Sequence, residues 1–317
     1  MKIFLAGATG AVGRPLVRRL INSGHTIVGT TRSAWRAKEL AGEGVDPVVL
    51  DAFDLDALCD AIVSARPDVV VNQLTAFSAP LNVRRFDKWS RETNRLREEV
   101  APRIVEAARM AESHTVAVQS IAFATAPGEM PVCDESAPLY FDAPRQLRPA
   151  ILACSALEES ALSVDGLNGI VLRYGWFYGP GTGYARDGYV ADMLRKRQYP
   201  IIGSGNGQFS FIHVDDAADA TIAAITRGVR GIYNICDDEP ARVDDWLPEM
   251  AHLLGAGRPY RIPVALARVA AGPVAVHYAT SLRGASNARA RRELDWTPRY
   301  ANWREGFAAT MSDRVVR

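Results

Sequence analysis

The first fourteen residues contain the feature that most constrains the fold of this chain, a short apolar run followed by three glycines at a spacing of three. Residues 3–6 (IFLA) have the composition of a buried parallel strand, and apolar residues recur at helical spacing from 12 to 21. Between these segments stand Gly7, Gly10 and Gly13. Strand, glycine turn and helix in this order bind a pyrophosphate, because the helix N-terminus offers free N–H groups and a positive dipole. The segment therefore predicts a dinucleotide-binding fold.

The end of the second predicted strand indicates which dinucleotide is bound. An NAD-specific enzyme usually carries Asp or Glu about 20 residues after the glycines, where the carboxylate binds the ribose hydroxyl. No acidic residue occurs from position 30 to 36, where Arg32 and Arg36 stand instead, and Arg14 lies in the first helical turn. Guanidinium groups bind phosphate monoesters through paired hydrogen bonds, so the pattern predicts NADP(H) rather than NAD(H). The alternative is that Arg32 and Arg36 are solvated surface charges.

Strands and helices alternate through the first half of the chain, as they do in a doubly wound parallel sheet. A long helical stretch over 84–112 contains Pro102, which we expect to kink the helix. In the second half, glycines and aromatic residues cluster and the alternation is lost. We therefore predict an α/β protein with a Rossmann-type, doubly wound parallel sheet and a smaller, discontinuous C-terminal substrate lobe. The NADP(H)-binding domain is expected over 1–174, with residues 209–236 returning to it, and the substrate lobe mainly over 175–317.

Composition excludes several classes of partner. The net charge is +1, which provides no field for nucleic acid, and no apolar run reaches the roughly 18 residues of a membrane span. Because the first residues are already strand and turn, we expect no cleaved signal peptide and predict a cytoplasmic protein that binds a small-molecule substrate. No structural metal or disulfide framework is expected, since no CxxC motif or Cys/His cluster is formed by Cys59, Cys133, Cys154 and Cys236.

Further motifs are distributed over nearly the whole chain. They are GATGAVG at 7–13, Asp51, Asn94, Ser120, LRYGWFYGPG at 172–181, FIHVDDAADA at 211–220, YNICDDEP at 233–240 and SNARARRELDW at 286–296. With them the chain resembles the extended short-chain dehydrogenase/reductase superfamily, in its branch of nucleoside-diphosphate-sugar epimerases and dehydratases. The motifs are specific for the fold and much less specific for the reaction, because function depends on the site.

The resemblance implies roles for matching positions. Ser120 would donate a hydrogen bond to the reacting oxygen, and Arg283 resembles the arginine that binds the diphosphate of a nucleotide sugar. The alternatives are that Asp51 only caps a turn and that Arg283 is an ordinary surface arginine. The implied cofactor-binding residues are Gly7, Thr9, Gly10, Ala11, Val12, Gly13, Arg14, Thr31, Arg32, Arg36, Asp51, Ala52, Leu74, Thr75, Asn94, Ser120, Tyr174, Gly175, Trp176 and Phe177.

The chain departs from the superfamily at its usual catalytic pair, a tyrosine followed four residues later by a lysine. None of the ten tyrosines has a lysine at that spacing, and Ile151 and Ser155 stand where the pair belongs. In the pair the lysine lowers the pKa of the phenol, so that the phenol exchanges a proton near neutral pH. The chain is therefore similar to atypical members of the superfamily, with the proton supplied by water or by another group. The predicted catalytic residues are Ser120, Tyr178 and Tyr184, with Tyr140 as a further phenol.

The loops expected around the cleft are rich in aromatic residues and poor in charge, which favours a small, flat, hydrophobic substrate. The predicted substrate-binding residues are Phe77, Trp89, Tyr178, Tyr184, Phe209 and Arg283.

From these features we predict an NADP(H)-dependent oxidoreductase that reduces a carbonyl or an activated double bond of a small hydrophobic metabolite. One alternative is a non-catalytic NADP(H)-binding redox sensor. Another is a nucleotide-sugar epimerase or dehydratase with a rebuilt active site. A homodimer through the helices at about 84–112 and 150–163 is a further expectation.

Overall fold

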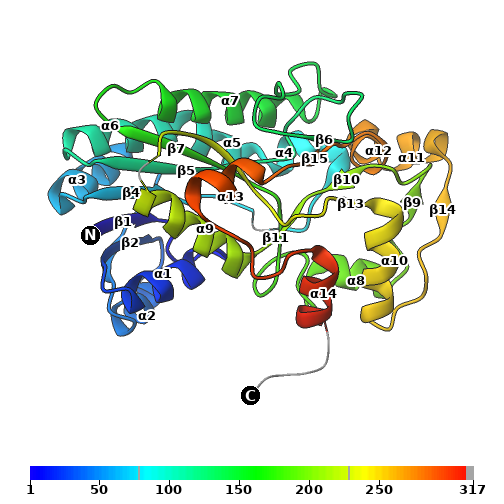
Figure 1. Cartoon of the computed structure of the whole chain (residues 1–317), viewed down its shortest axis with the longest axis horizontal. Coiled ribbons are helices and arrows are strands. Elements are labelled where there is room, and N and C mark those ends of the chain that lie inside the picture. Colours follow the sequence, from blue (N-terminus) through cyan, green and yellow to red (C-terminus); the bar gives the residue numbers. More distant parts are fainter. Residues whose placement is uncertain (78, 228, 312–317) are drawn as a thin grey trace.

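The computed structural model describes residues 1–77, 79–227 and 229–311, and a seven-stranded parallel sheet forms its centre (Figure 1). The strands lie in the order β12-β7-β5-β4-β1-β2-β3, so the chain first builds outward from β1 on one side and then from β4 on the other. This confirms the predicted Rossmann-type, doubly wound sheet. The strands are β1 (Lys2–Ala6), β2 (Thr26–Thr31), β3 (Asp46–Val49), β4 (Val69–Asn72), β5 (Thr115–Ile121), β7 (Asn168–Tyr174) and β12 (Gly231–Ile235).

Helices cover both faces of the sheet because its strands are apolar on both faces. Ile3 and Leu5 of β1 point into one hydrophobic cluster, whereas Phe4 and Ala6 point into another on the opposite face. Figure 1 shows α6 and α7 along one side of the sheet and α1 and α9 along the other. The flanking helices are α1 (Gly13–Asn22), α2 (Ala34–Gly42) and α9 (Val214–Arg227) on one face, and α3 (Leu55–Ala65), α6 (Ala101–Met110) and α7 (Arg148–Leu162) on the other.

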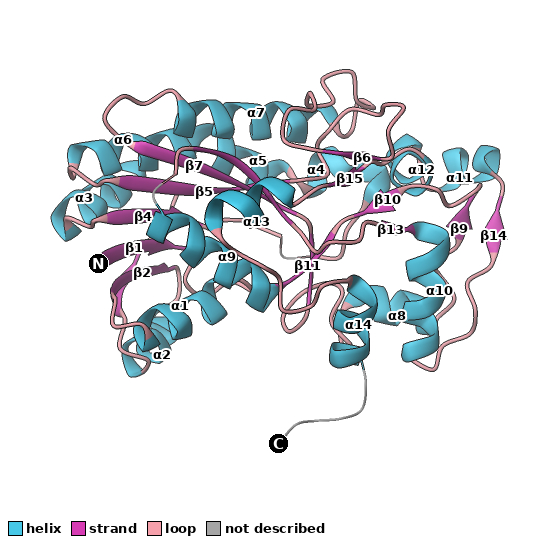
Figure 2. Cartoon of the chain, in the orientation of Figure 1, coloured by secondary structure: helices cyan, strands magenta, loops and turns pink. Residues whose placement is uncertain are grey.

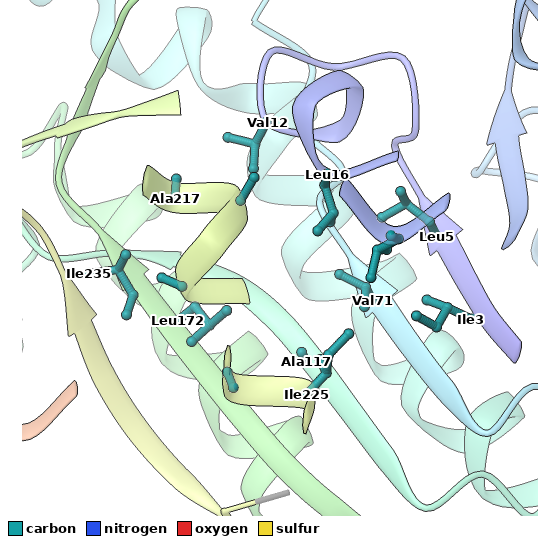
Figure 3. Packing of buried hydrophobic residues seen from close by; sticks show 14 of the residues in the cluster. Ile3, Leu5, Val12, Leu16, Val71, Ala117, Leu172, Ala217, Ile225 and Ile235 are labelled. Carbon is teal, nitrogen blue, oxygen red and sulfur yellow. The ribbon is translucent and has the colours of Figure 1, made fainter. Parts of the chain in front are cut away.

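The close-up in Figure 3 shows how α1 and α9 pack on the sheet. Leu5, Val71 and Leu172 project from three strands toward Leu16 of α1 and Ala217 of α9, and all five side chains are fully buried. This packing fixes the start of α1 against the end of β1, and with it the position of the glycine turn.

The helical stretch predicted over 84–112 is divided into several pieces. A π-helical turn, η2 (Leu96–Val100), separates α5 from α6, in which Pro102 occupies the first turn. Proline has no N–H and its ring clashes with the carbonyl four residues earlier, so an undistorted α-helix cannot run through this point. The break predicted at Pro102 thus takes the form of a π-helical turn. The preceding pieces are η1 (Val83–Arg85), α4 (Phe86–Trp89) and α5 (Arg91–Arg95).

Beyond β7 the chain forms short strand pairs and helices at the end of the molecule away from the N-terminus (Figure 2). A second cluster, dominated by aromatic side chains, holds this region together. Within the range predicted to return to the first domain, α9 and β12 pack on or join the central sheet, and residues 312–317 lie outside the described residues. The strand pairs are β8 (Trp176–Tyr178) with β11 (Phe211–His213), β10 (Gln208–Phe209) with β13 (Ala241–Arg242), β9 (Ile201–Ile202) with β14 (Arg261–Ile262), and β6 (Val132–Cys133) with β15 (Gly284–Ala285). The helices are α8 (Tyr189–Arg195), α10 (Val243–Leu253), α11 (Val264–Ala270), α12 (Pro273–Thr280), α13 (Ala288–Leu294) and α14 (Trp303–Met311).

Two kinds of feature are absent from the described residues. None of the helices described has the length and apolar character needed to cross a membrane. Within the same ranges, no group of three or more His, Cys, Asp or Glu side chains is placed to hold a metal ion.

Candidate active site

A cleft of about 1140 Å³ lies at the carboxyl ends of the sheet strands. Its walls include the residues that directly follow β1, β2, β4 and β7, and its far end is lined by aromatic side chains. The strand order reverses between β1 and β4, and ligands of open α/β sheets bind at such a point. Position and size together make this cleft the candidate site for a dinucleotide and a substrate.

The glycine loop fits a pyrophosphate. Gly7 has a positive φ of 92°, and a Cβ atom on this residue would lie 2.9 Å from the carbonyl oxygen of Gln73. A Cβ atom on Gly13 would overlap the carbonyl oxygen of Gly7, so the close approach of helix and loop requires glycine there. Helix α1 begins at Gly13 with no side-chain cap and no acidic residue in its first turn. Its N–H groups and positive dipole are therefore available to an anion in the cleft.

The residues after β2 line one end of the cleft. Ser33 accepts a hydrogen bond from the backbone N–H of Arg36 at 3.4 Å and so caps α2, which places the residues around it at the cleft wall. Arg32 and Arg36 are exposed and have no acidic partner among the residues that the structure describes. Asp51 also lines the cleft, where its Oδ1 accepts the backbone N–H of Phe53 at 3.1 Å. Asp51 therefore shapes its own turn while facing the cleft.

Most residues predicted to bind the cofactor are brought together by the fold. Arg14 is placed slightly apart, because it lines a small adjoining pocket and its Nε donates to the carbonyl oxygen of Thr9 at 3.3 Å. The predicted cofactor residues that line the main cleft are Gly7, Thr9, Gly10, Ala11, Val12, Gly13, Thr31, Arg32, Arg36, Asp51, Ala52, Leu74, Thr75, Gly175, Trp176 and Phe177.

Ser120 does not face the cleft, which corrects the role expected for its hydroxyl. Gln119 and Ile121 line the cleft, and side chains alternate along a strand, so Ser120 points to the opposite face. There its hydroxyl donates to Oε1 of Glu158 at 2.6 Å. Glu158 also binds Arg173 through two hydrogen bonds, of 2.8 and 2.6 Å, and all three side chains are buried. Ser120 is therefore a ligand of a buried ion pair rather than a group that meets a substrate.

Asn94 and Tyr174 lie behind the cleft wall instead of in it. The Tyr174 hydroxyl bonds Gln73 Nε2 at 3.0 Å and Thr221 at 2.7 Å, and Gln73 is the residue that reaches the cleft. Burial raises the pKa of Tyr174 to about 12, although both hydrogen bonds oppose the rise. Asn94 donates to Ser90, which likewise lines the cleft. Both residues support lining side chains.

The tyrosines predicted as proton donors are buried phenols with raised pKa values. Tyr178 is fully buried outside the cleft, where it packs against Phe307 and where a Cβ on Gly306 would overlap its hydroxyl. Burial raises its pKa, and nearby carboxylates add to the rise. Tyr184 does line the cleft, but burial raises its pKa well above 10, with a further contribution from Tyr199. Both phenols therefore hold their protons tightly near neutral pH.

The cleft wall carries no second Tyr/Lys pair among its described residues. Among the described residues of the cleft wall there is no lysine and no histidine. At the position of the usual tyrosine, Ile151 is fully buried and its neighbour Ala150 lines the cleft. Burial also raises the pKa of Tyr189 to about 12. The ionisable lining residues are Arg32, Arg36, Asp51, Glu92, Arg97, Tyr184 and Tyr189.

Two stacked aromatic pairs line the far end of the cleft. Phe77 and Trp89 stack with ring centroids 4.2 Å apart, and Phe123 and Trp176 stack at 4.0 Å. Flat aromatic walls of this kind suit a planar ring. Of the predicted substrate residues, Phe77, Trp89 and Tyr184 line the cleft.

Phe209 and Arg283 lie outside the cleft lining. Phe209 stacks behind Trp176 at 5.1 Å, and the Arg283 Nε donates to the carbonyl oxygen of Met130 at 2.7 Å. The geometry therefore does not bring Arg283 to the position expected of a residue that binds a nucleotide-sugar diphosphate.

Sequence analysis missed two residues of the far end, Phe123 and Arg97. Arg97 lies eight positions after Trp89, about two helical turns, so helical spacing along the predicted helix could have found it. Phe123 follows β5 in a loop, where no periodic signal exists.

Comparison with known proteins places the chain in a family. Residues 3–236 match the NAD dependent epimerase/dehydratase family, and the chain belongs to it, within the extended short-chain dehydrogenase/reductase superfamily. A Streptomyces protein named 3-diazoavenalumate denitrifying reductase is 45% identical over 310 residues, which cover 97% of this chain and 99% of that protein. The family and this relative support an oxidoreductase of the short-chain dehydrogenase/reductase kind with a nicotinamide cofactor.

Solved structures share the fold at lower identity. Human epimerase family protein SDR39U1 (isoform 2) with NADPH has a TM-score of 0.76 at 19% identity, over 98% of this chain and 99% of that one. UDP-glucose 4-epimerase from Thermotoga maritima with UDP-glucose also has a TM-score of 0.76 at 19% identity, over 98% and 97% of the two chains.

Proposed function

We propose that this chain is an NADP(H)-dependent reductase that removes a diazo group from a small aromatic substrate as dinitrogen. The observation that carries the proposal is a cleft that joins a dinucleotide-binding loop to stacked aromatic walls without the Tyr/Lys pair. A hydride acceptor that needs no proton fits such a cleft. The Streptomyces relative, named as a denitrifying reductase of 3-diazoavenalumate, supports this class of substrate.

The balance of atoms and charge explains why the pair is dispensable. When bound, NADPH would supply a hydride to the terminal nitrogen of an aryl diazonium group, and collapse of the resulting diazene would release N₂ and leave hydrogen on the ring carbon. One diazonium cation and one NADPH then give one arene, one N₂ and one NADP⁺. Where the diazonium group stands next to an ionised phenol, the product is a phenolate that takes one proton from water after N₂ has left. The hydride step itself needs no proton from the protein, so Ile151 and Ser155 at the positions of the usual pair are compatible with the reaction.

The chain's own residues would act by binding and orientation. The planar ring would lie along the aromatic wall that includes Phe123, which stacks on Trp176, and the backbone at Gly175 would border the nicotinamide. Aromatic faces also attract cations, which suits a diazonium group in a desolvated slot. Their apolar surface would keep water from the reacting nitrogen.

The preference for NADP(H) rests on Arg32 and Arg36. Both line the cleft beside the cap of α2, and neither is paired with an acid among the described residues. Two free guanidinium groups at the end of β2 suit the 2′-phosphate that distinguishes NADP(H).

Reduction of a carbonyl or an activated double bond is the second candidate. The aromatic slot suits these substrates equally, but both reactions need a proton. Water would have to supply it, because the pKa of Tyr184 is raised by burial and the Ser120 hydroxyl is bound to Glu158.

The test is a turnover assay with diazotised 3-amino-4-hydroxycinnamate and NADPH. NADPH oxidation is followed by absorbance and dinitrogen by mass spectrometry of the isotopically labelled gas, with heat-inactivated protein as the control for spontaneous reduction. We expect NADPH loss and N₂ release in equal amounts. Phe123→Ala is expected to raise KM for the diazo compound and to leave the Kd for NADPH unchanged, because Phe123 lines only the aromatic end.

Two results would refute the proposed reaction. NADPH oxidation with a carbonyl or alkene panel but not with the diazo compound favours the second candidate. Tight NADPH binding with no oxidation in any mixture favours a redox sensor.

A further inference from the structure

Arg97 is a buried cation in the cleft wall without a counter-ion. Its side chain is 3% exposed, yet it lines the cleft. It forms no hydrogen bond or ion pair with any residue of the described ranges. Buried charges are normally paired, because removing an ion from water costs several kcal/mol unless another charge or dipole replaces the water. An unpaired guanidinium at a cleft surface therefore indicates a partner that arrives from the cleft.

The acids nearest to Arg97 are already engaged or lie elsewhere. Glu158, on the neighbouring α7, is bound to Arg173 and Ser120. Glu98 and Glu99 flank Arg97 on the π-helical turn, but Glu99 is paired with Arg95 and neither bonds Arg97. Glu92 and Asp51, the acidic residues that line the cleft, form no ion pair with Arg97 either. The chain thus supplies no anion to Arg97 within its described residues.

Arg97 lies near Tyr278, at the aromatic end of the cleft. Burial raises the pKa of the Tyr278 phenol, Cys154 adds to the rise and Arg97 opposes it. Tyr278 packs edge-on against Trp176 at 5.5 Å and Phe123 at 6.5 Å, which are the stacked pair of the proposed ring site. The hydroxyl of Tyr278 is itself buried without a hydrogen-bond partner among the described atoms. Arg97 and the aromatic walls therefore belong to one end of the cleft, and Tyr278 packs behind these walls.

The local backbone is unusual at the same point. Arg97 is the second residue of the π-helical turn η2, and single π-turns inside helices occur frequently at functional sites. The wider turn changes the direction in which its side chains project relative to those of α5. In a regular α-helix the Arg97 side chain would project in a different direction from the helix axis.

We propose that Arg97 binds the carboxylate of the substrate, so that the enzyme acts on aromatic acids rather than on neutral aromatic compounds. A carboxylate matches a planar guanidinium through two parallel hydrogen bonds, and the phosphates of the dinucleotide have their own site at the glycine loop. The ring of the acid lies along the aromatic wall of the cleft that includes Phe123. The inference rests on the proposed function for the identity of the reacting group, but not for the carboxylate.

The test uses ligands that cannot react. Protein loaded with NADP⁺ is titrated with trans-cinnamate and with its methyl ester, and binding is followed by quenching of tryptophan fluorescence. The titrations are repeated on Arg97→Gln, on Arg97→Lys and on Arg109→Gln, a control for loss of an exposed arginine further along the same helical stretch. Circular dichroism and the Kd for NADP⁺ establish that each variant is folded and loaded.

We expect the wild type to bind the acid about 10- to 100-fold more tightly than the ester, as for a hydrogen-bonded charge pair in a desolvated site. Arg97→Gln should remove this preference, Arg97→Lys should retain part of it, and Arg109→Gln should leave it unchanged. Equal binding of acid and ester, a preference that survives Arg97→Gln, or no binding of the acid at millimolar concentration would each overturn the proposal. Because neither ligand carries a diazo group, failure of the turnover assay and failure of this test are separate results.

Discussion

The buried ion pair behind the cleft yields a prediction whose magnitude follows from its geometry. Arg173 and Glu158 are 4% and 5% exposed, joined by two hydrogen bonds, and Glu158 also accepts the Ser120 hydroxyl. Replacing Glu158 by Ala leaves the Arg173 guanidinium buried without its counter-ion. Breaking a buried pair in this way costs about 3–5 kcal/mol, because the desolvation of the remaining charge is no longer compensated. For a chain of this size the melting temperature should fall by about 5–8 °C.

The assay is thermal and urea unfolding followed by circular dichroism on matched variants. The double variant Glu158→Leu/Arg173→Met should recover most of the lost stability, since apolar residues of similar volume avoid the desolvation cost altogether. Glu106→Ala is the control, because it removes one partner of an exposed pair with Arg109 and should leave the melting temperature unchanged. A Glu158→Ala variant as stable as the wild type, or a double variant less stable than the single one, would refute the reasoning.

Four further predictions follow from the same structure. Ser120→Ala should lower stability by about 1 kcal/mol in urea unfolding and leave kcat unchanged, whereas a large loss of kcat would restore the catalytic role that the sequence suggested. The variant Arg32→Ala/Arg36→Ala should weaken NADPH binding by about 10-fold or more and leave NADH binding unchanged in calorimetric titrations, and equal losses for both cofactors would contradict it. Gly13→Ala should abolish binding of either cofactor. Gly42→Ala, at a position with free space and no positive φ, is the control for loss of a glycine and should leave both Kd values unchanged. Burial lowers the pKa of His277 to about 4, so its neutral form contributes stability above pH 6.5 that is lost as the pH falls toward 4, by about 3 kcal/mol in total; His277→Gln should flatten the unfolding profile over this interval, and an unchanged slope would disprove the assignment.

The state of the phenols in the cleft bears on the chemistry proposed for this chain. From the sequence, the missing Tyr/Lys pair only raised the question of what replaces it. The cleft offers Tyr184 and Tyr189 as its lining phenols within the described residues, and burial raises the pKa of both. The proposed hydride transfer to a diazonium group needs no proton donor from the protein in that step, so the missing pair is consistent with the proposal.

The sequence by itself determined the parts of this protein that depend on local pattern. The strand, glycine turn and helix at 3–21 specified the sheet class and the cofactor loop, since tight turns and close helix packing restrict these positions to glycine. The position of Arg32 and Arg36 just after the second strand was likewise readable, because their place at the cleft follows from the order of elements. The absence of the usual catalytic pair required only a count of residues.

The tertiary structure alone decided which side chains reach the cleft. Ser120 is a polar residue at the end of a central strand, but the register of β5 turns it toward Glu158, which lies 38 positions further along the chain. Tyr178 lies within a motif typical of the family, yet packing against α14 buries it in the second core. Arg97 looks like any surface charge on a helix until the fold buries it. Burial and counter-ions come from contacts distant in sequence, so only the folded chain distinguishes a solvated arginine from an unpaired cation facing a cleft.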